Sequence, residues 1–126
     1  MQYEIKHLGK FKFVQEGQGE PLVLLHGLFG ALSNFKDLVD CFKEKYTVYI
    51  PMLPLYDLTN LDTSVSGLAK HVAKFIEAKK LTGVHLMGNS LGGHIALVYA
   101  LKHPDRVKTI TLTGSSGLFE NGMGET

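Results

Sequence analysis

The alternation of apolar and polar residues along the chain predicts a sheet that begins with a hairpin. On either side of Gly9, residues 3–8 and 10–15 place apolar side chains at every second position, which is typical of two antiparallel strands with one buried face. Segments 22–25 and 46–52 are instead mostly apolar without a break, as expected of central strands covered on both faces. Two further strands are predicted at residues 84–87 and 107–113.

Between these strands, apolar residues recur three and four positions apart, which predicts amphipathic helices. The first helix follows Ser33, its expected N-cap, and the second spans about 63–80. The third runs from Leu91 to about Lys102, where the pair His103-Pro104 stops it. The apolar face of the first helix holds Phe35, Leu38, Val39 and Phe42, and that of the second holds Val65, Leu68, Val72, Phe75 and Ile76.

A leading hairpin followed by strands that alternate with helices is the element order of an α/β domain with an open, mostly parallel sheet. Right-handed crossovers are expected to place the helices on both faces of this sheet. The 126 residues fit one domain, and no repeat or low-complexity linker marks a second one.

Composition and charge exclude several classes of partner. The formal net charge is +1 without any basic or acidic block, so neither nucleic acid nor a membrane surface is an expected partner. Residues 1–13 lack the apolar core of a signal peptide, and no apolar run is long enough to cross a membrane, so we expect a cytoplasmic protein. The single cysteine, Cys41, excludes an internal disulfide, and its apolar neighbours at 38–42 predict a buried structural thiol.

The strongest chemical signal is the segment 88–92, Gly-Asn-Ser-Leu-Gly, which fits the pattern G-x-S-x-G between a predicted strand and a predicted helix. A nucleophile on so sharp a turn takes a strained backbone conformation, so Gly88 and Gly92 must lack side chains. Ser90 then stands clear of the sheet at a helix N-terminus, whose N–H groups favour developing negative charge. A plain glycine-rich turn is the alternative interpretation. A dinucleotide fingerprint is not favoured, because its glycine spacing differs and the next strand ends in Thr113 rather than an acidic residue.

A second motif, His26-Gly27-Leu28-Phe29-Gly30, follows the first apolar run. A strand that ends in His-Gly before a loop can present a backbone N–H to an oxyanion, and the second donor is the N–H of Leu91, the residue after the nucleophile. Leu28 is the first choice for the loop donor and Phe29 the second. His26 is also a candidate base, but we interpret it as a residue that shapes the turn.

Together these motifs resemble the α/β-hydrolase family. The stretch HGLFGALSNF (26–35) is similar to the oxyanion loop of a branch that includes esterases, haloperoxidase-like enzymes and carbon–carbon bond hydrolases, and GNSLGG (88–93) is similar to the nucleophile turn of the last group. Residues 102–117 resemble the passage from the nucleophile helix to the sixth strand. Many relatives have Pro-Gly-x-Gly where this chain has Pro-Leu-Tyr-Asp at 54–57, which alters one wall of the expected pocket.

The resemblance implies a triad in the order serine, acid, histidine, and the residues after Ser90 supply no suitable pair. His103 and Asp105 follow a helix of about twelve residues, which places them roughly 18 Å from the serine. His94, one helical turn after Ser90, is the best rival base within the chain, although we expect it to face the flanking structure.

The remaining acids, Glu120 and Glu125, lie in a glycine-rich tail that cannot hold an imidazole in place. We therefore expect the acid and the histidine beyond Thr126. Residues 1–126 are then the N-terminal portion of a single α/β-hydrolase domain, truncated after about the sixth strand, and the last strand at 107–113 is an uncovered edge.

The function implied by the resemblance is a serine hydrolase that acts on a small apolar ester, or on a carbon–carbon bond next to a ketone. Ser90 is the nucleophile, and no metal or organic cofactor is expected. The chain alone is expected to be inactive, with the missing C-terminal half of the same protein as its partner. Two alternatives are a non-catalytic α/β module that binds a ligand or partner through the edge at 107–113, and one subunit of a split enzyme. A reactive Ser90 distinguishes an enzyme from a binding module.

Overall fold

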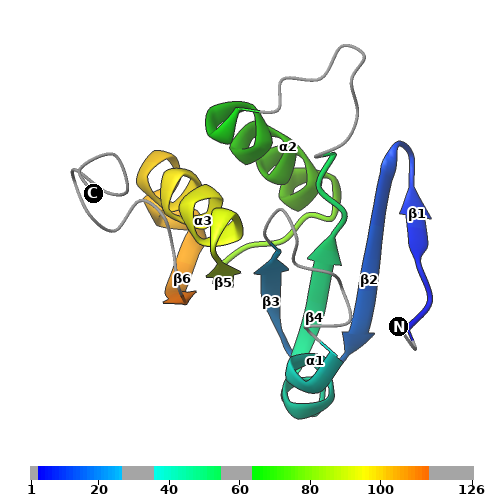
Figure 1. The fold of residues 1–126 in the computed structure, drawn as a ribbon. Coiled ribbons are helices and arrows are strands. Elements are labelled where there is room, and N and C mark those ends of the chain that lie inside the picture. Colours follow the sequence, from blue (N-terminus) through cyan, green and yellow to red (C-terminus); the bar gives the residue numbers. More distant parts are fainter. Residues whose placement is uncertain (1–2, 27–35, 55–63, 114–126) are drawn as a thin grey trace.

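The computed structural model describes residues 3–26, 36–54 and 64–113. In chain order the elements are β1 (Lys6–Leu8), β2 (Phe11–Gly17), β3 (Glu20–Leu25), α1 (Lys36–Phe42), β4 (Tyr46–Pro51), α2 (Val65–Ala78), β5 (Val84–Asn89), α3 (Leu91–Lys102), the short 3-10 helix η2 (Pro104–Arg106) and β6 (Val107–Thr113) (Figure 1).

The strands form one six-stranded sheet in the order β1-β2-β4-β3-β5-β6. The pairs β1–β2 and β2–β4 are antiparallel, whereas β4, β3, β5 and β6 are mutually parallel neighbours. The predicted α/β fold with a leading hairpin and a mostly parallel sheet is therefore confirmed. The largest difference in length is at β1, which begins three residues after the predicted start, at Lys6, and β5 continues two residues past its predicted end, to Asn89.

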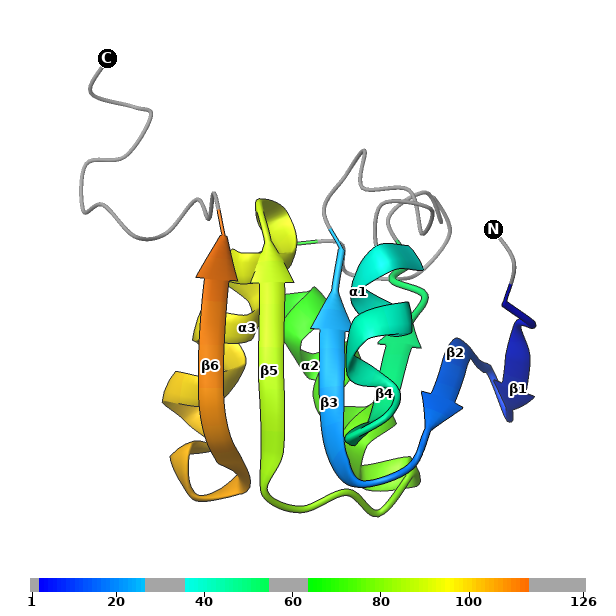
Figure 2. The same cartoon turned by 90° about the horizontal axis from the view of Figure 1, so that it is seen from below.

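The helices lie on both faces of the sheet, as predicted. Helices α2 and α3 cover one face, and α1 lies in front of β3 and β4 on the other (Figure 2). On this second face the described helices leave β5 and β6 open, so the surface of these two strands is accessible beside α1.

Successive residues of the central strands point into two separate hydrophobic layers. In β3, Val23 and Leu25 belong to the cluster under α2 and α3, and Leu22 and Leu24 belong to the cluster that includes Val39 of α1. Both sets are almost completely buried. The prediction that residues 22–25 form a central strand covered on both faces is therefore confirmed, because each face of β3 packs against helices.

Helix α2 has the predicted amphipathic form. Its N-cap is Ser64, whose Oγ accepts the backbone N–H of Gly67 at 3.1 Å. The predicted stripe faces the sheet, with Val65 partly buried at its edge. The fully buried members are Leu68, Val72, Phe75 and Ile76, to which the structure adds Ala69.

Two sequence-based predictions are wrong. Cys41 is exposed rather than buried, because α1 turns only Val39 fully inward and a residue two positions later lies on the opposite side of the helix. The hairpin is also not buried along its whole length. Phe11 and Phe13 of β2 are buried, but β1 lies at the sheet edge and its Leu8 is 39% exposed.

At the other end of the sheet, β6 pairs with β5 among the described residues, and most of its residues are exposed. The predicted open edge is present in this part of the chain. No helix in the described ranges is long and apolar enough to span a membrane.

His71 on α2 gives the fold a predictable pH dependence. Its ring packs 5.2 Å from that of Phe11. Burial lowers the pKa of the imidazole below its usual value, and the nearby charges of Lys10 and Lys74 lower it further. As the pH falls below about 6.5, the usual pKa of histidine, His71 binds a proton more readily in the unfolded chain than in the folded one. The free energy of unfolding therefore decreases as the pH is lowered through this range.

We predict that wild-type protein loses more unfolding free energy than His71→Phe between about pH 7.5 and pH 5.5. Phenylalanine keeps an aromatic ring against Phe11 but has no proton to bind. Urea titrations followed by circular dichroism measure both values, and equal losses in the two proteins would contradict this assignment.

Candidate functional site at the ends of strands β3 and β5

The site suggested by the sequence lies where two adjacent parallel strands end. Leu25 of β3 pairs with Gly88 of β5, so the segments that follow these two strands, from His26 and from Ser90, leave the sheet close to each other. The chain passes from β3 to α1 on one face and from β5 to α3 on the other (Figures 1 and 2). Such a point in an open parallel sheet leaves a crevice at the carboxyl ends of the strands, where ligands bind.

Ser90 occupies the sharp turn between β5 and α3 in a strained conformation. Its φ is 56° and its ψ is −122°, a region that a residue with a side chain rarely adopts. In the described residues Lys80 is the other non-glycine with a positive φ. Ser90 is exposed, and its side chain makes no capping bond to the helix that it precedes.

Backbone hydrogen bonds hold this turn. The N–H of Ser90 donates to the carbonyl oxygen of Thr113 at 3.0 Å, and the Ser90 carbonyl accepts from Gly93 at 3.0 Å and from His94 at 3.2 Å. In addition, the Thr113 hydroxyl donates to Oδ1 of Asn89 at 3.0 Å. Strain of this kind costs about 1–3 kcal/mol, and each hydrogen bond returns about 1 kcal/mol, so the surrounding bonds are sufficient to maintain it.

The two glycines of the motif are required by close packing. A Cβ atom on Gly88 would lie 2.4 Å from the carbonyl oxygen of Gly92. A Cβ on Gly92 would lie 2.1 Å from the carbonyl oxygen of Leu25 and 2.8 Å from that of His26. The first turn of α3 therefore rests directly on the end of β3, which brings the two predicted motifs together.

Leu91 is the first residue of α3. The first N–H groups of a helix have no partner within the helix, and they concentrate positive charge beside Ser90. Gly27, Leu28 and Phe29, which complete the predicted oxyanion motif, lie outside the described residues.

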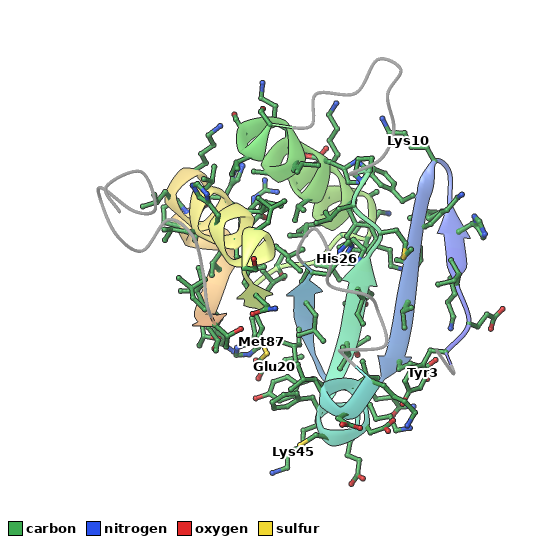
Figure 3. The ribbon with its side chains drawn as sticks, in the orientation of Figure 1. Tyr3, Lys10, Glu20, His26, Lys45 and Met87 are labelled. Atoms are coloured by element: carbon green, nitrogen blue, oxygen red, sulfur yellow. The ribbon has the colours of Figure 1, made fainter. Side chains whose placement is uncertain are left out.

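His26 is buried at the end of β3, with 8% of its surface exposed. Its Nε2 accepts the backbone N–H of Leu53 at 3.2 Å, which ties the end of β3 to the segment that follows β4 (Figure 3). Because this bond uses the lone pair of Nε2, it favours the turn-shaping interpretation of His26 over the interpretation as a base.

The other candidate bases lie in different positions. His94 is half-buried in the first turn of α3. His103 caps the far end of that helix, where its ring lies 4.8 Å from that of Tyr99. The helix of twelve residues separates it from Ser90 by roughly 18 Å, as expected from the sequence. Glu120 and Glu125 lie outside the described residues.

Sequence reasoning missed two participants, Thr113 and Leu53. Both act mainly through backbone groups, so their side chains give no signal. Their roles depend on which strands are neighbours, which a single sequence does not reveal. Among the described residues, no group of three His, Cys, Asp or Glu side chains could hold a metal ion.

The contact between α3 and β3 gives a stability prediction. Gly92→Ala forces a methyl group against the Leu25 carbonyl and should lower the free energy of unfolding by at least about 3 kcal/mol. Gly9→Ala is the matched control, because Gly9 has a φ of 58° but open space around its Cβ position, so only about 1–2 kcal/mol of backbone strain applies. Denaturant titrations measure both, and a cost for Gly92→Ala no larger than that for Gly9→Ala would contradict the packing argument.

Comparison with known proteins agrees with this geometry. Residues 20–124 match the sequence profile of the alpha/beta hydrolase fold. An alpha/beta hydrolase enzyme from the metagenome of Mar Chica lagoon sediments in Morocco is 47% identical in sequence to this chain. Its crystal structure matches the present structure with a TM-score of 0.87, and the match covers 93% of this chain and 54% of that one.

Curated relatives include Lipase 3 of Moraxella sp. (strain TA144), 33% identical over 83% of this chain, and 2-hydroxy-6-oxo-2,4-heptadienoate hydrolase of Pseudomonas putida, 29% identical over 81%. The matched residues span 35% and 40% of the length of these two proteins. The profile match and the structural similarity, which extend over most of the sequence, show that this chain belongs to the alpha/beta hydrolase fold family.

Proposed function

We propose that this chain carries the nucleophile of a serine hydrolase and that Ser90 is the nucleophile. The observation that carries the proposal is the strained, exposed conformation of Ser90 at the end of β5. A helix N-cap normally accepts an N–H bond from its own helix in an unstrained conformation, as Ser64 does for α2. Ser90 does neither, so a capping role does not account for the strain, whereas presentation of a hydroxyl above the sheet does.

The oxyanion is stabilised in this proposal by two backbone N–H groups. One is the N–H of Leu91 at the start of α3, and the other is that of Leu28, with Phe29 as the second choice. Support comes from the contact of Gly92 with the carbonyls of Leu25 and His26, because it fixes the start of the loop next to the nucleophile turn.

The acid and the histidine of the triad are proposed to lie outside these 126 residues, in the remainder of a single α/β-hydrolase domain. Two observations support this: the chain spans little more than a third of the length of these curated relatives, and His26, at the end of β3, has its Nε2 engaged by the backbone N–H of Leu53. In the complete site the histidine takes the Ser90 proton while Ser90 Oγ attacks the substrate carbonyl carbon, the bond to the leaving group breaks, and the leaving group receives the proton. Water, deprotonated by the same histidine, then attacks the acyl carbon, and the acid product leaves as Ser90 regains its proton.

The proposed substrate is a small apolar ester, with a carbon–carbon bond beside a ketone as the second candidate. Lipases and a dienoate hydrolase among the relatives support these two classes. Both reactions need the same nucleophile and oxyanion donors, so the residues described here serve either one. A cytoplasmic protein without an organic cofactor remains our expectation.

A fluorophosphonate probe followed by intact-mass measurement tests the nucleophile. Two proteins are compared: the 126-residue chain, and a chimera in which the remaining part of the Mar Chica hydrolase follows Thr113. We expect the chain to keep its mass near 13.9 kDa and the chimera to gain one adduct that maps to Ser90.

Ser90→Ala in the chimera is the control and should abolish the adduct. If the 126-residue chain itself is labelled at Ser90, a base such as His94 lies within it and the proposal about the remainder is wrong. If the folded chimera is not labelled at Ser90, the serine is not activated and a non-catalytic binding module becomes the better interpretation.

A further inference from the structure

A second cluster of polar side chains lies near the amino ends of the parallel strands, away from Ser90. Glu20 is the first residue of β3, His85 the second of β5 and Thr109 the third of β6. Glu20 lies with Met87 on the side of the sheet where α1 packs (Figure 3). None of the three takes part in the proposed hydrolase chemistry.

His85 joins the other two side chains through both ring nitrogens. Its Nε2 lies 2.8 Å from Oε1 of Glu20, and its Nδ1 lies 2.7 Å from the hydroxyl oxygen of Thr109. A carboxylate only accepts hydrogen bonds, so in a neutral imidazole Nε2 carries the proton and Nδ1 has the free lone pair. Nδ1 therefore accepts the hydroxyl proton of Thr109.

The carboxylate is held in its charged form. Hydrogen bonds from Lys108, at 2.9 Å, and from His85 lower the pKa of the Glu20 carboxyl below its usual value. An ionised Glu20 accepts the proton on Nε2 and so fixes the tautomer and orientation of the His85 ring. Acid, base and hydroxyl thus stand in the order that activates a hydroxyl nucleophile.

A hollow of about 180 Å³ opens beside this hydroxyl. Its walls combine apolar side chains with the polar groups of His85 and Thr109. The ring of Tyr46 lies edge-on to that of His85, with the ring centroids 5.3 Å apart. A short acyl chain or an aryl group fits such a space and chemistry.

We infer that Thr109 is an acyl-acceptor site for small activated esters, with His85 as its general base and Glu20 as the residue that orients His85. This site is independent of Ser90 and of the proposed hydrolase function.

In the reaction, Thr109 Oγ forms a bond to the acyl carbon while its proton passes to Nδ1 of His85. The bond between the acyl carbon and the ester oxygen then breaks, and the leaving alcohol takes up the proton. The products are an O-acyl threonine and a free alcohol, and no oxidant or cofactor is needed.

The test uses p-nitrophenyl acetate and the full 126-residue chain with Cys41→Ser and Ser90→Ala, which remove the exposed thiol and the proposed nucleophile. Peptic digestion and mass spectrometry should locate one acetyl group on Thr109. Alkaline hydroxylamine should remove it, because at high pH this reagent cleaves aliphatic esters and leaves acetylated lysines intact.

Thr109→Val should abolish this hydroxylamine-sensitive label, and His85→Gln should slow its formation by about a hundredfold or more, the lower end of a general-base effect. Thr109→Ser should restore labelling, and Thr82→Val, at an exposed threonine between α2 and β5, should leave it unchanged. Thermal unfolding verifies that each variant is folded.

A label that maps elsewhere, or a Thr109 label whose rate is unchanged in folded His85→Gln, would overturn the inference. Neither result depends on Ser90, which is absent from these proteins, so the proposed hydrolase function is judged separately.

Discussion

The close approach of α3 to the end of β3 is the constraint on which the site depends. The backbone of Gly92 packs against the Leu25 carbonyl where a Cβ atom would stand only 2.1 Å away. This contact fixes how steeply the chain turns from β5 into α3, and Ser90 at the turn takes a conformation that it would not adopt alone. Interiors are close-packed, so such a contact transmits its geometry directly to the neighbouring residues.

The sheet supplies the rest of the support. Parallel pairing of β3 with β5 places the two motifs side by side, and pairing of β5 with β6 brings the Thr113 carbonyl to the N–H of Ser90. The same three strands carry Glu20, His85 and Thr109 near their amino ends. One sheet therefore carries a hydroxyl side chain near each end of its central strands, Ser90 after β5 and Thr109 near the start of β6.

Much of this arrangement follows from local sequence signals. The apolar run at 22–25, the stripe on α2 and the G-x-S-x-G turn each report a local requirement of burial or backbone geometry, and each prediction is confirmed in the fold. Cys41 was misplaced because its apolar neighbours do not show which side of a short helix faces inward. The Thr113 and Leu53 contacts and the Glu20–His85–Thr109 cluster were missed because they join residues far apart in the chain. Such contacts are set by strand order, which periodicity does not encode.

The fold holds Ser90 in a strained backbone conformation, and the Ser90→Gly substitution tests this most directly. Glycine removes the strain of about 1–3 kcal/mol and adds about 0.5–1 kcal/mol of chain entropy to the unfolded state, so the variant should be more stable than the wild type. Ser64→Gly, at the unstrained N-cap of α2, should be less stable by a few tenths of a kcal/mol. Denaturant titrations measure both, and a Ser90→Gly protein less stable than the wild type would contradict the account.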